Sequence, residues 1–262
     1  MEAADVELAS EDVLNEPFLQ RMRHHAGDAL KRAVSKVLGL LDAQAKLIFI
    51  DQSVPPSKQT FLKLHEIGHA ALPWQKAMYS VIEDCKQTIA PDISDHFDRE
   101  ANAFASEVLF QCDTFTKEAA DFDFGIKVPI NLSKKYGSSV YSAVRRYVAT
   151  SYRSCVVLIT NPPEFVDGSG FIAVLRRVEA SENFKQQFGS LAWTEQLTPD
   201  DQFGAIIPLN GRRMSGKRNC VLKDIDGIEH ECVAEAFTNT YQVFILIYPM
   251  RALTRTLIAL SG

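Results

Sequence analysis

The sequence lacks any long uninterrupted apolar run. Its longest apolar stretch, VFILIY at residues 243–248, is far shorter than the roughly 18–20 residues that a membrane-spanning helix needs. Residues 1–18, MEAADVELASEDVLNEPF, are acidic and lack the basic and apolar regions of a signal peptide. We therefore expect no membrane anchor and no secretory leader.

Paired cysteines are missing as well. The chain has five cysteines, an odd number, and no two of them have C-x-x-C spacing. This argues against a disulfide framework as the organising feature, and it favours a reducing, cytoplasmic location. Most of these cysteines are expected to be small buried residues, with Cys112 a special case discussed below.

The sequence has no excess of basic residues. It has 28 Lys and Arg against 33 Asp and Glu, a net charge of −5, so its overall charge gives no argument for nucleic acid or an anionic membrane as partner. The length of 262 residues is enough for two modest domains, and a hydrophobic content of 46% is ordinary for a globular protein.

Chemistry is concentrated in the stretch FLKLHEIGH at residues 61–69. His65 and His69 are four residues apart, so a helix places both imidazoles on one face, one turn apart. Two neutral imidazoles can fill two positions of a tetrahedral zinc site, and Glu66 can act as a general base toward water. The spacing predicts a helix over 58–71.

An H-E-x-x-H motif also arises by chance, in this composition with a probability on the order of 1 in 100. The ordinary alternative is a helix with two packed or solvated histidines. Around the motif, the apolar pattern predicts a helix over 16–41 and the run AKLIFID predicts a strand that ends at Asp51.

A catalytic zinc site needs a third protein ligand. Glu100 lies 31 residues after His69, in a helix predicted over 94–110, and it borders the apolar face of that helix. Geometry alone favours Glu100, and it leaves Asp95, His96 and Asp98 as alternatives.

The combination of HEIGH with EANAFASEVLF about thirty residues later resembles the ImmA/IrrE family of zinc metallopeptidases, over about residues 20–150. The resemblance implies a zincin-like, helix-rich metallopeptidase domain in residues 1–150 that binds Zn²⁺. It assigns His65, His69 and Glu100 as zinc ligands and Glu66 as the catalytic base. By analogy, supporting roles fall to Asn102, Phe104 and Glu107.

The same resemblance implies a protein substrate, typically a helix-turn-helix transcriptional repressor whose cleavage derepresses stress or anti-phage genes. Two other functions remain open. The chain could be a peptidase-like binding module without catalysis, or a toxin peptidase that acts on host proteins.

Cys112 follows the predicted ligand helix, where the family pattern usually continues into Met-Pro. A thiolate is a strong zinc ligand, and a fourth protein ligand would close the site to water. This suggests an inhibitory cysteine latch. It requires the chain to turn back after Phe110, since Cys112 otherwise lies about 18 Å from Glu100 along a helix. A buried structural cysteine is the simpler interpretation.

The pattern after about residue 150 predicts strands separated by Pro- and Gly-containing turns. We therefore expect an α+β protein, in which a smaller, mainly antiparallel α+β domain at 151–262 follows the peptidase domain. By resemblance, this second domain would be a GAF- or PAS-like sensor for an unknown activating ligand.

Two helices, 132–136 and 140–149, are spaced to pack as a helix-turn-helix at the end of the first domain. Direct DNA contact through their basic residues is a weaker prediction than a solvated charged face; these residues are Lys134, Lys135, Arg145 and Arg146. An oxyanion-stabilising group could come from Tyr141, Arg145, Tyr147 or His96.

Overall fold

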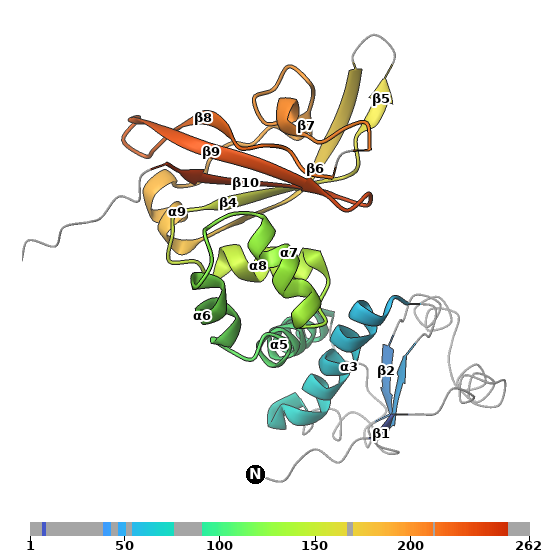
Figure 1. Cartoon of the computed structure of the whole chain (residues 1–262). Helices are drawn as coiled ribbons and strands as arrows, with labels where there is room; N and C mark the ends of the chain where they lie inside the picture. Colours follow the sequence, from blue (N-terminus) through green and yellow to red (C-terminus); the bar gives the residue numbers. More distant parts are fainter. Residues whose placement is uncertain are drawn as a thin grey trace, which may run out of the picture. The chain divides into compact units, whose positions relative to one another are not determined.

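The computed structural model describes residues 7–8, 39–42, 47–50, 54–75, 91–166, 170–211 and 213–250 (Figure 1). Packing divides them into two compact units. The first contains the described residues up to Thr114 together with Lys134–Ser139, and the second contains Phe115–Ser133 and the described residues from Val140 onward. These units differ from the predicted ranges 1–150 and 151–262, and the functional division at residue 150 stays a prediction.

A small sheet in the first unit has the order β1-β3-β2. Strand β3 (Leu47–Ile50) runs parallel to β1 (Glu7–Leu8) and antiparallel to β2 (Gly39–Asp42). The strand predicted before Asp51 is confirmed. The predicted helix over 16–41 is wrong for its last three residues, which pair with β3; its other residues, 16–38, lie outside the described part of the chain.

Helices α3 (Pro56–Ala71) and α5 (Pro91–Leu109) form the rest of the first unit. Proline is well tolerated as the first residue of α3, where its missing N–H would have no helical partner. A Cβ on Gly68 would lie 3.1 Å from the Cα of Ala101, so the missing side chain lets the two helices approach closely. Helix α3 also contacts β2 and β3.

A tight turn ends α5. The N–H of Cys112 donates to the Glu107 carbonyl and that of Gln111 donates to the Val108 carbonyl, the pair of bonds that defines a Schellman motif. Gln111 and Cys112 both have left-handed backbone angles, with φ of 53° and 54°. The chain therefore does turn after Phe110, and α6 (Thr114–Ala120) follows.

The second unit is built on a seven-stranded sheet with the order β5-β6-β4-β10-β9-β8, in which every pairing is antiparallel and β7 pairs with β6. Its strands are β4 (Val156–Thr160), β5 (Glu164–Val166), β6 (Gly170–Ala180), β7 (Gln196–Leu197), β8 (Arg218–Lys223), β9 (Glu229–Thr238) and β10 (Val243–Pro249). The central strands β4 and β10 are buried along almost their whole length, as expected for strands covered on both faces.

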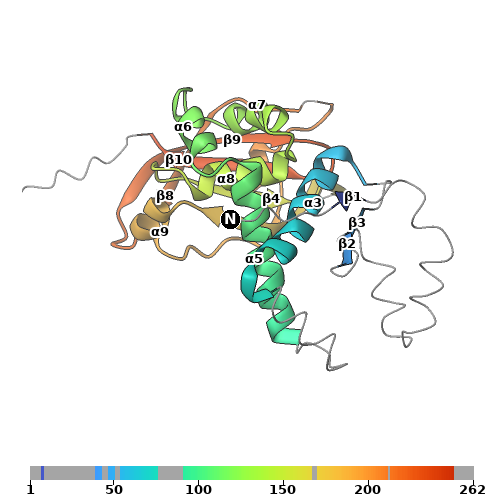
Figure 2. The same cartoon turned by 90° about the horizontal axis from the view of Figure 1, so that it is seen from below.

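Both faces of this sheet are covered. Helix α8 (Val140–Ala149) packs on β4 and β6 (Figure 2). Helix α7 (Lys127–Lys135) precedes it in the sequence. A hydrophobic core packs the sheet against α9 (Glu182–Phe188) and the 3₁₀ turn η1 (Gly204–Ile206). It includes Leu158, Phe184 and Phe203. The predicted α+β class, with helices first and an antiparallel sheet after them, is confirmed. None of the described helices is both long enough and apolar enough to span a membrane.

Candidate metal centre

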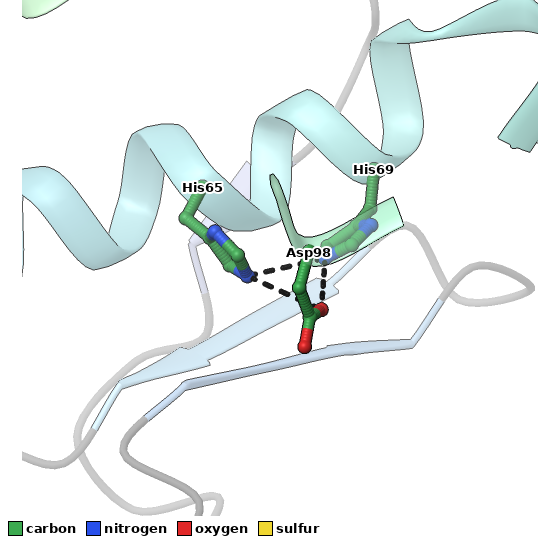
Figure 3. Close-up of side chains that lie close together, drawn as sticks. All are labelled: His65, His69 and Asp98. Carbon is green, nitrogen blue, oxygen red and sulfur yellow. Dashed lines mark hydrogen bonds and ion pairs between the residues drawn. The ribbon is translucent and has the colours of Figure 1, made fainter. Parts of the chain in front are cut away.

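His65 and His69 project from the same face of α3, as their spacing predicts. Their Nε2 atoms are 3.1 Å apart, and the ring centroids are 4.7 Å apart with the rings nearly perpendicular. Asp98 of α5 lies opposite, with its Oδ1 3.5 Å from Nε2 of His69 and 4.0 Å from Nε2 of His65 (Figure 3). The two helices thus bring two nitrogen donors and one oxygen donor to a single point.

This donor set fits a zinc ion. Two imidazole nitrogens and a carboxylate oxygen are a known ligand set of catalytic zinc sites. Zn–N bonds of about 2.0–2.1 Å at a tetrahedral angle place two nitrogens about 3.3–3.4 Å apart. The ligand atoms of His65, His69 and Asp98 all lie within 4.8 Å of one another, so small side-chain adjustments suffice to close the site around an ion.

Both imidazoles are oriented by an amide side chain at the other ring nitrogen. Nδ1 of His65 lies 3.1 Å from Oδ1 of Asn102, and Nδ1 of His69 lies 2.6 Å from Oε1 of Gln75. An amide oxygen only accepts hydrogen bonds, so each Nδ1 carries the hydrogen and donates it, and each Nε2 keeps its lone pair for a metal. Burial, followed by the charge of His69, lowers the pKa of His65 and favours the neutral form that binds metal.

Glu66 is buried at 8% exposure despite its charge. Burial, followed by the nearby charge of Asp98, raises the pKa of Glu66 to about 7. A carboxylate with this pKa can both take up and release a proton near neutral pH, which is the property required of a general base.

The structure places Glu100 beside the histidine group and not within it. Its Oε2 accepts hydrogen bonds from Nε1 of Trp74 at 2.7 Å and from Nε2 of Gln75 at 2.8 Å, and its Oε1 lies 3.2 Å from Nε2 of His96. These contacts, that of Trp74 first, lower the pKa of Glu100. Asp98 takes the position that the sequence favoured for Glu100, and a ligand role for Glu100 stays a prediction.

Gln75 is a site residue that the sequence did not reveal. It is fully buried, it accepts from His69, and its Nε2 donates to Glu100 and to the carbonyl of Phe97. A single glutamine after Pro73 and Trp74 belongs to no motif. Its role depends on the short turn of helix at residues 73–75, which brings it back against α5.

Cys112 lies outside the His65, His69 and Asp98 group among the residues that the structure describes. It is exposed, in the turn after α5. The helix from Asp98 to Leu109 alone is about 16 Å long at 1.5 Å per residue, whereas a Zn–S bond is about 2.3 Å. The latch therefore requires a rearrangement at the end of α5, and it stays a prediction.

The other predicted side chains have partners of their own. Within the second unit, Nε of Arg145 pairs with Glu179 at 2.9 Å and its guanidinium covers the Tyr141 ring. Tyr147 is buried, its hydroxyl accepts from the N–H of Gly125, and burial raises its pKa. Their oxyanion and phosphate-binding roles stay predictions.

Residues 28–147 match the family model Peptidase_M78, described as the IrrE N-terminal-like domain. The match supports the ImmA/IrrE family predicted from the two motifs, and with it a metallopeptidase-type domain. The structure is also similar to that of a Mycobacterium tuberculosis transcriptional regulator, with a TM-score of 0.51 and 12% sequence identity. The aligned region covers 93% of this chain and 66% of that one, and at this identity the likeness shows the fold alone. No curated protein matches the chain significantly.

Proposed function

We propose, from the IrrE N-terminal-like match at residues 28–147, that the chain is a zinc-dependent endopeptidase that cleaves a transcriptional repressor. The observation that carries this proposal is the convergence of His65, His69 and Asp98, with the buried Glu66 in the same turn of α3. Burying a carboxylate at this position lowers the stability of a helix with a purely structural role, because an unpaired buried charge is unfavourable for folding.

When bound, a zinc ion would polarise the carbonyl of the scissile peptide bond and lower the pKa of a water molecule. Glu66 takes a proton from the attacking water and returns it to the leaving amine. Gln75 and Asn102 hold the imidazoles of His69 and His65 in the tautomer that presents Nε2 to the ion.

We assign the third ligand to Asp98 and give Glu100 a supporting role through Gln75. The comparison of Asp98→Asn with Glu100→Gln tests this assignment. Zinc content, measured by elemental analysis of the purified full chain, should fall to background in Asp98→Asn and stay near one per chain in Glu100→Gln. The reverse result would make Glu100 the ligand, as the family resemblance implies.

The substrate class follows from the family resemblance. The chain also resembles the CapP-type peptidases found beside CBASS anti-phage operons, so a small helix-turn-helix repressor is the expected substrate. In this proposal, the sheet unit is a GAF- or PAS-like sensor that controls cleavage when its ligand binds.

Incubation of the zinc-loaded protein with repressors from neighbouring genes, with the fragments identified by mass, tests cleavage. Glu66→Gln should abolish cleavage while zinc content remains. A repressor that binds the parent protein and Glu66→Gln alike, with cleavage by neither, would identify a binding module. Growth arrest upon expression, relieved by Glu66→Gln with every repressor intact, would identify a toxin.

A further inference from the structure

The second unit contains a cavity of about 210 Å³ between its sheet and the segment that leads from α9 to η1. Its lining includes Leu158 of β4, Leu197 of β7 and Leu222 of β8, all of them buried. These side chains give the cavity an apolar interior. The volume is below the roughly 300–1,000 Å³ of pockets for drug-sized molecules, so it suits an occupant of one or two rings.

Two aromatic side chains of the connecting segment also line the cavity. The rings of Trp193 and Phe203 have centroids 5.7 Å apart and are tilted by 57°. Trp193 is half-buried against the core and Phe203 is 7% exposed. Aromatic groups prefer such tilted or offset partners, so the pair offers a planar guest a ring face and a ring edge.

Asp201 is the single charged residue among those that line the cavity. Its Oδ2 accepts from the N–H of Thr198 at 2.7 Å and from the hydroxyl of Thr198 at 3.0 Å, which holds the carboxylate in place. Among the described residues none donates to Oδ1, so this oxygen is available to a guest. A fixed carboxylate selects for a donor or a cation and against an anion.

The backbone at 198–204, which forms one wall of the cavity, is tightly packed. A Cβ on Gly204 would lie 1.8 Å from the Thr198 carbonyl oxygen, so the backbone at 198–204 folds tightly onto itself. The N–H of Ala205 donates to the carbonyl of Asp201. Leu197 pairs with Ala173 of β6, which ties the wall to the sheet. A wall held in this way loses little conformational freedom when a ligand binds.

From these features we infer that the cavity is a binding site for a planar aromatic molecule of one or two rings that carries an N–H donor or a positive charge. The site is distinct from the metal centre, and it stands whether or not the chain is a peptidase. It is also a concrete location for a ligand of the second unit.

Calorimetric titration of the full chain with three two-ring probes tests the inference: neutral indole, cationic tryptamine and anionic indole-3-acetate. Indole and tryptamine should bind with a stoichiometry of one, and indole-3-acetate at least tenfold more weakly than tryptamine. Asp201→Asn keeps an acceptor for Thr198 and should reduce the difference between the two charged probes to less than threefold.

Ala192→Phe places a ring at an exposed position of the cavity lining and should weaken tryptamine binding at least tenfold. Ala120→Phe, a matched change at another exposed alanine, should leave it unchanged, and so should Glu66→Gln. Absence of saturable heat with both indole and tryptamine, or equal binding by Ala192→Phe and the parent protein, would overturn the site. Equal binding of all three probes to the parent would overturn the role of Asp201.

Discussion

At the scale of single residues, Glu66 connects the burial of the site to its chemistry. It is 8% exposed, and its pKa is raised from 4.5 to about 7 by burial and by the charge of Asp98. The metal-free folded protein therefore holds this proton more tightly than the unfolded chain does. The resulting stability is fully present below pH 4.5 and is lost as the pH rises through 7.

We predict that this loss amounts to about 3 kcal/mol of unfolding free energy, since one pKa unit corresponds to about 1.4 kcal/mol. Urea unfolding of the EDTA-treated protein between pH 4.5 and 8 measures it. Glu66→Gln has no titrating carboxyl group at this position. Its unfolding free energy should therefore change less between pH 4.5 and 8, by about 3 kcal/mol. Parallel curves for the two proteins would contradict the raised pKa.

Gln75 should matter to the metal because it orients His69. Gln75→Ala removes the acceptor of Nδ1, and we predict a 10- to 100-fold loss of zinc affinity, the usual effect of removing such a partner. Competition with a chromophoric chelator measures this loss. Gln59→Ala is the matched control, because Gln59 lies in α3, six residues before His65, and donates to the Val54 carbonyl. Equal zinc affinity in Gln75→Ala and the control would argue against the orienting role.

The spacing in HEIGH was sufficient to predict that His65 and His69 share a helix face, and the structure places them so. Which of Asp98 and Glu100 lies beside the histidines could not be predicted from the sequence, because it depends on how α5 is rotated against α3. The contact of Gly68 with Ala101 sets that rotation. Asp98 lies three residues before Ala101 and so on the same face, whereas Glu100 is about 100° away.

At the scale of elements, the candidate metal centre depends on the close approach of α3 and α5. A Cβ on Gly68 would lie 3.1 Å from Cα of Ala101 and 3.2 Å from the Phe104 ring. Because one of these neighbours is backbone, a larger side chain must push the helices apart. The same displacement would move Asp98 away from the histidines.

We predict that Gly68→Val lowers the unfolding free energy by about 1–3 kcal/mol, the usual cost of overpacking, and also weakens zinc binding. Thermal melting and zinc content are the two measurements. Gly216→Val serves as the control, because a Cβ on Gly216 would meet nothing within 4 Å. A Gly68→Val protein with the zinc content of the control would show that the helix spacing does not limit the site.

Element boundaries were predicted best where the pattern is local. The helix with the histidines begins at Pro56, two residues before the prediction. Helix α7 begins at Lys127 rather than Leu132. Pro129 lies in its first turn, where a backbone N–H would have no acceptor within the helix, so proline is tolerated there. The strand at 39–42 was missed because its apolar run also suits a helix, and only pairing with β3 decides between them.

At the scale of the whole molecule, the two tryptophans report on different compact units. Trp74 belongs to the first unit and Trp193 to the second, and the chain has no other tryptophan. Trp74→Phe and Trp193→Phe therefore leave one fluorophore each. The metal centre lies entirely in the unit of Trp74, and the aromatic cavity lies entirely in the unit of Trp193.

We predict that EDTA lowers the melting temperature reported by Trp74 and leaves the melting temperature reported by Trp193 nearly unchanged. A ligand at 100 times its Kd adds about 2.7 kcal/mol only to the part of the protein that binds it. Fluorescence melting of the two single-tryptophan variants, with zinc and with EDTA, measures both changes. Equal shifts would mean that the units unfold as one.

The strand order of the second sheet also has a consequence for synthesis on the ribosome. Its first strand, β4, pairs with its last described strand, β10, so the centre of the sheet cannot form until Pro249 has been made. The bond from Ile126 to the Glu235 carboxylate joins residues 109 apart and also needs most of the sheet to have been made. Helices α3 and α5 need only the chain up to Leu109, so they can pack while the sheet is still being translated. The candidate metal centre can therefore assemble before the sheet unit does.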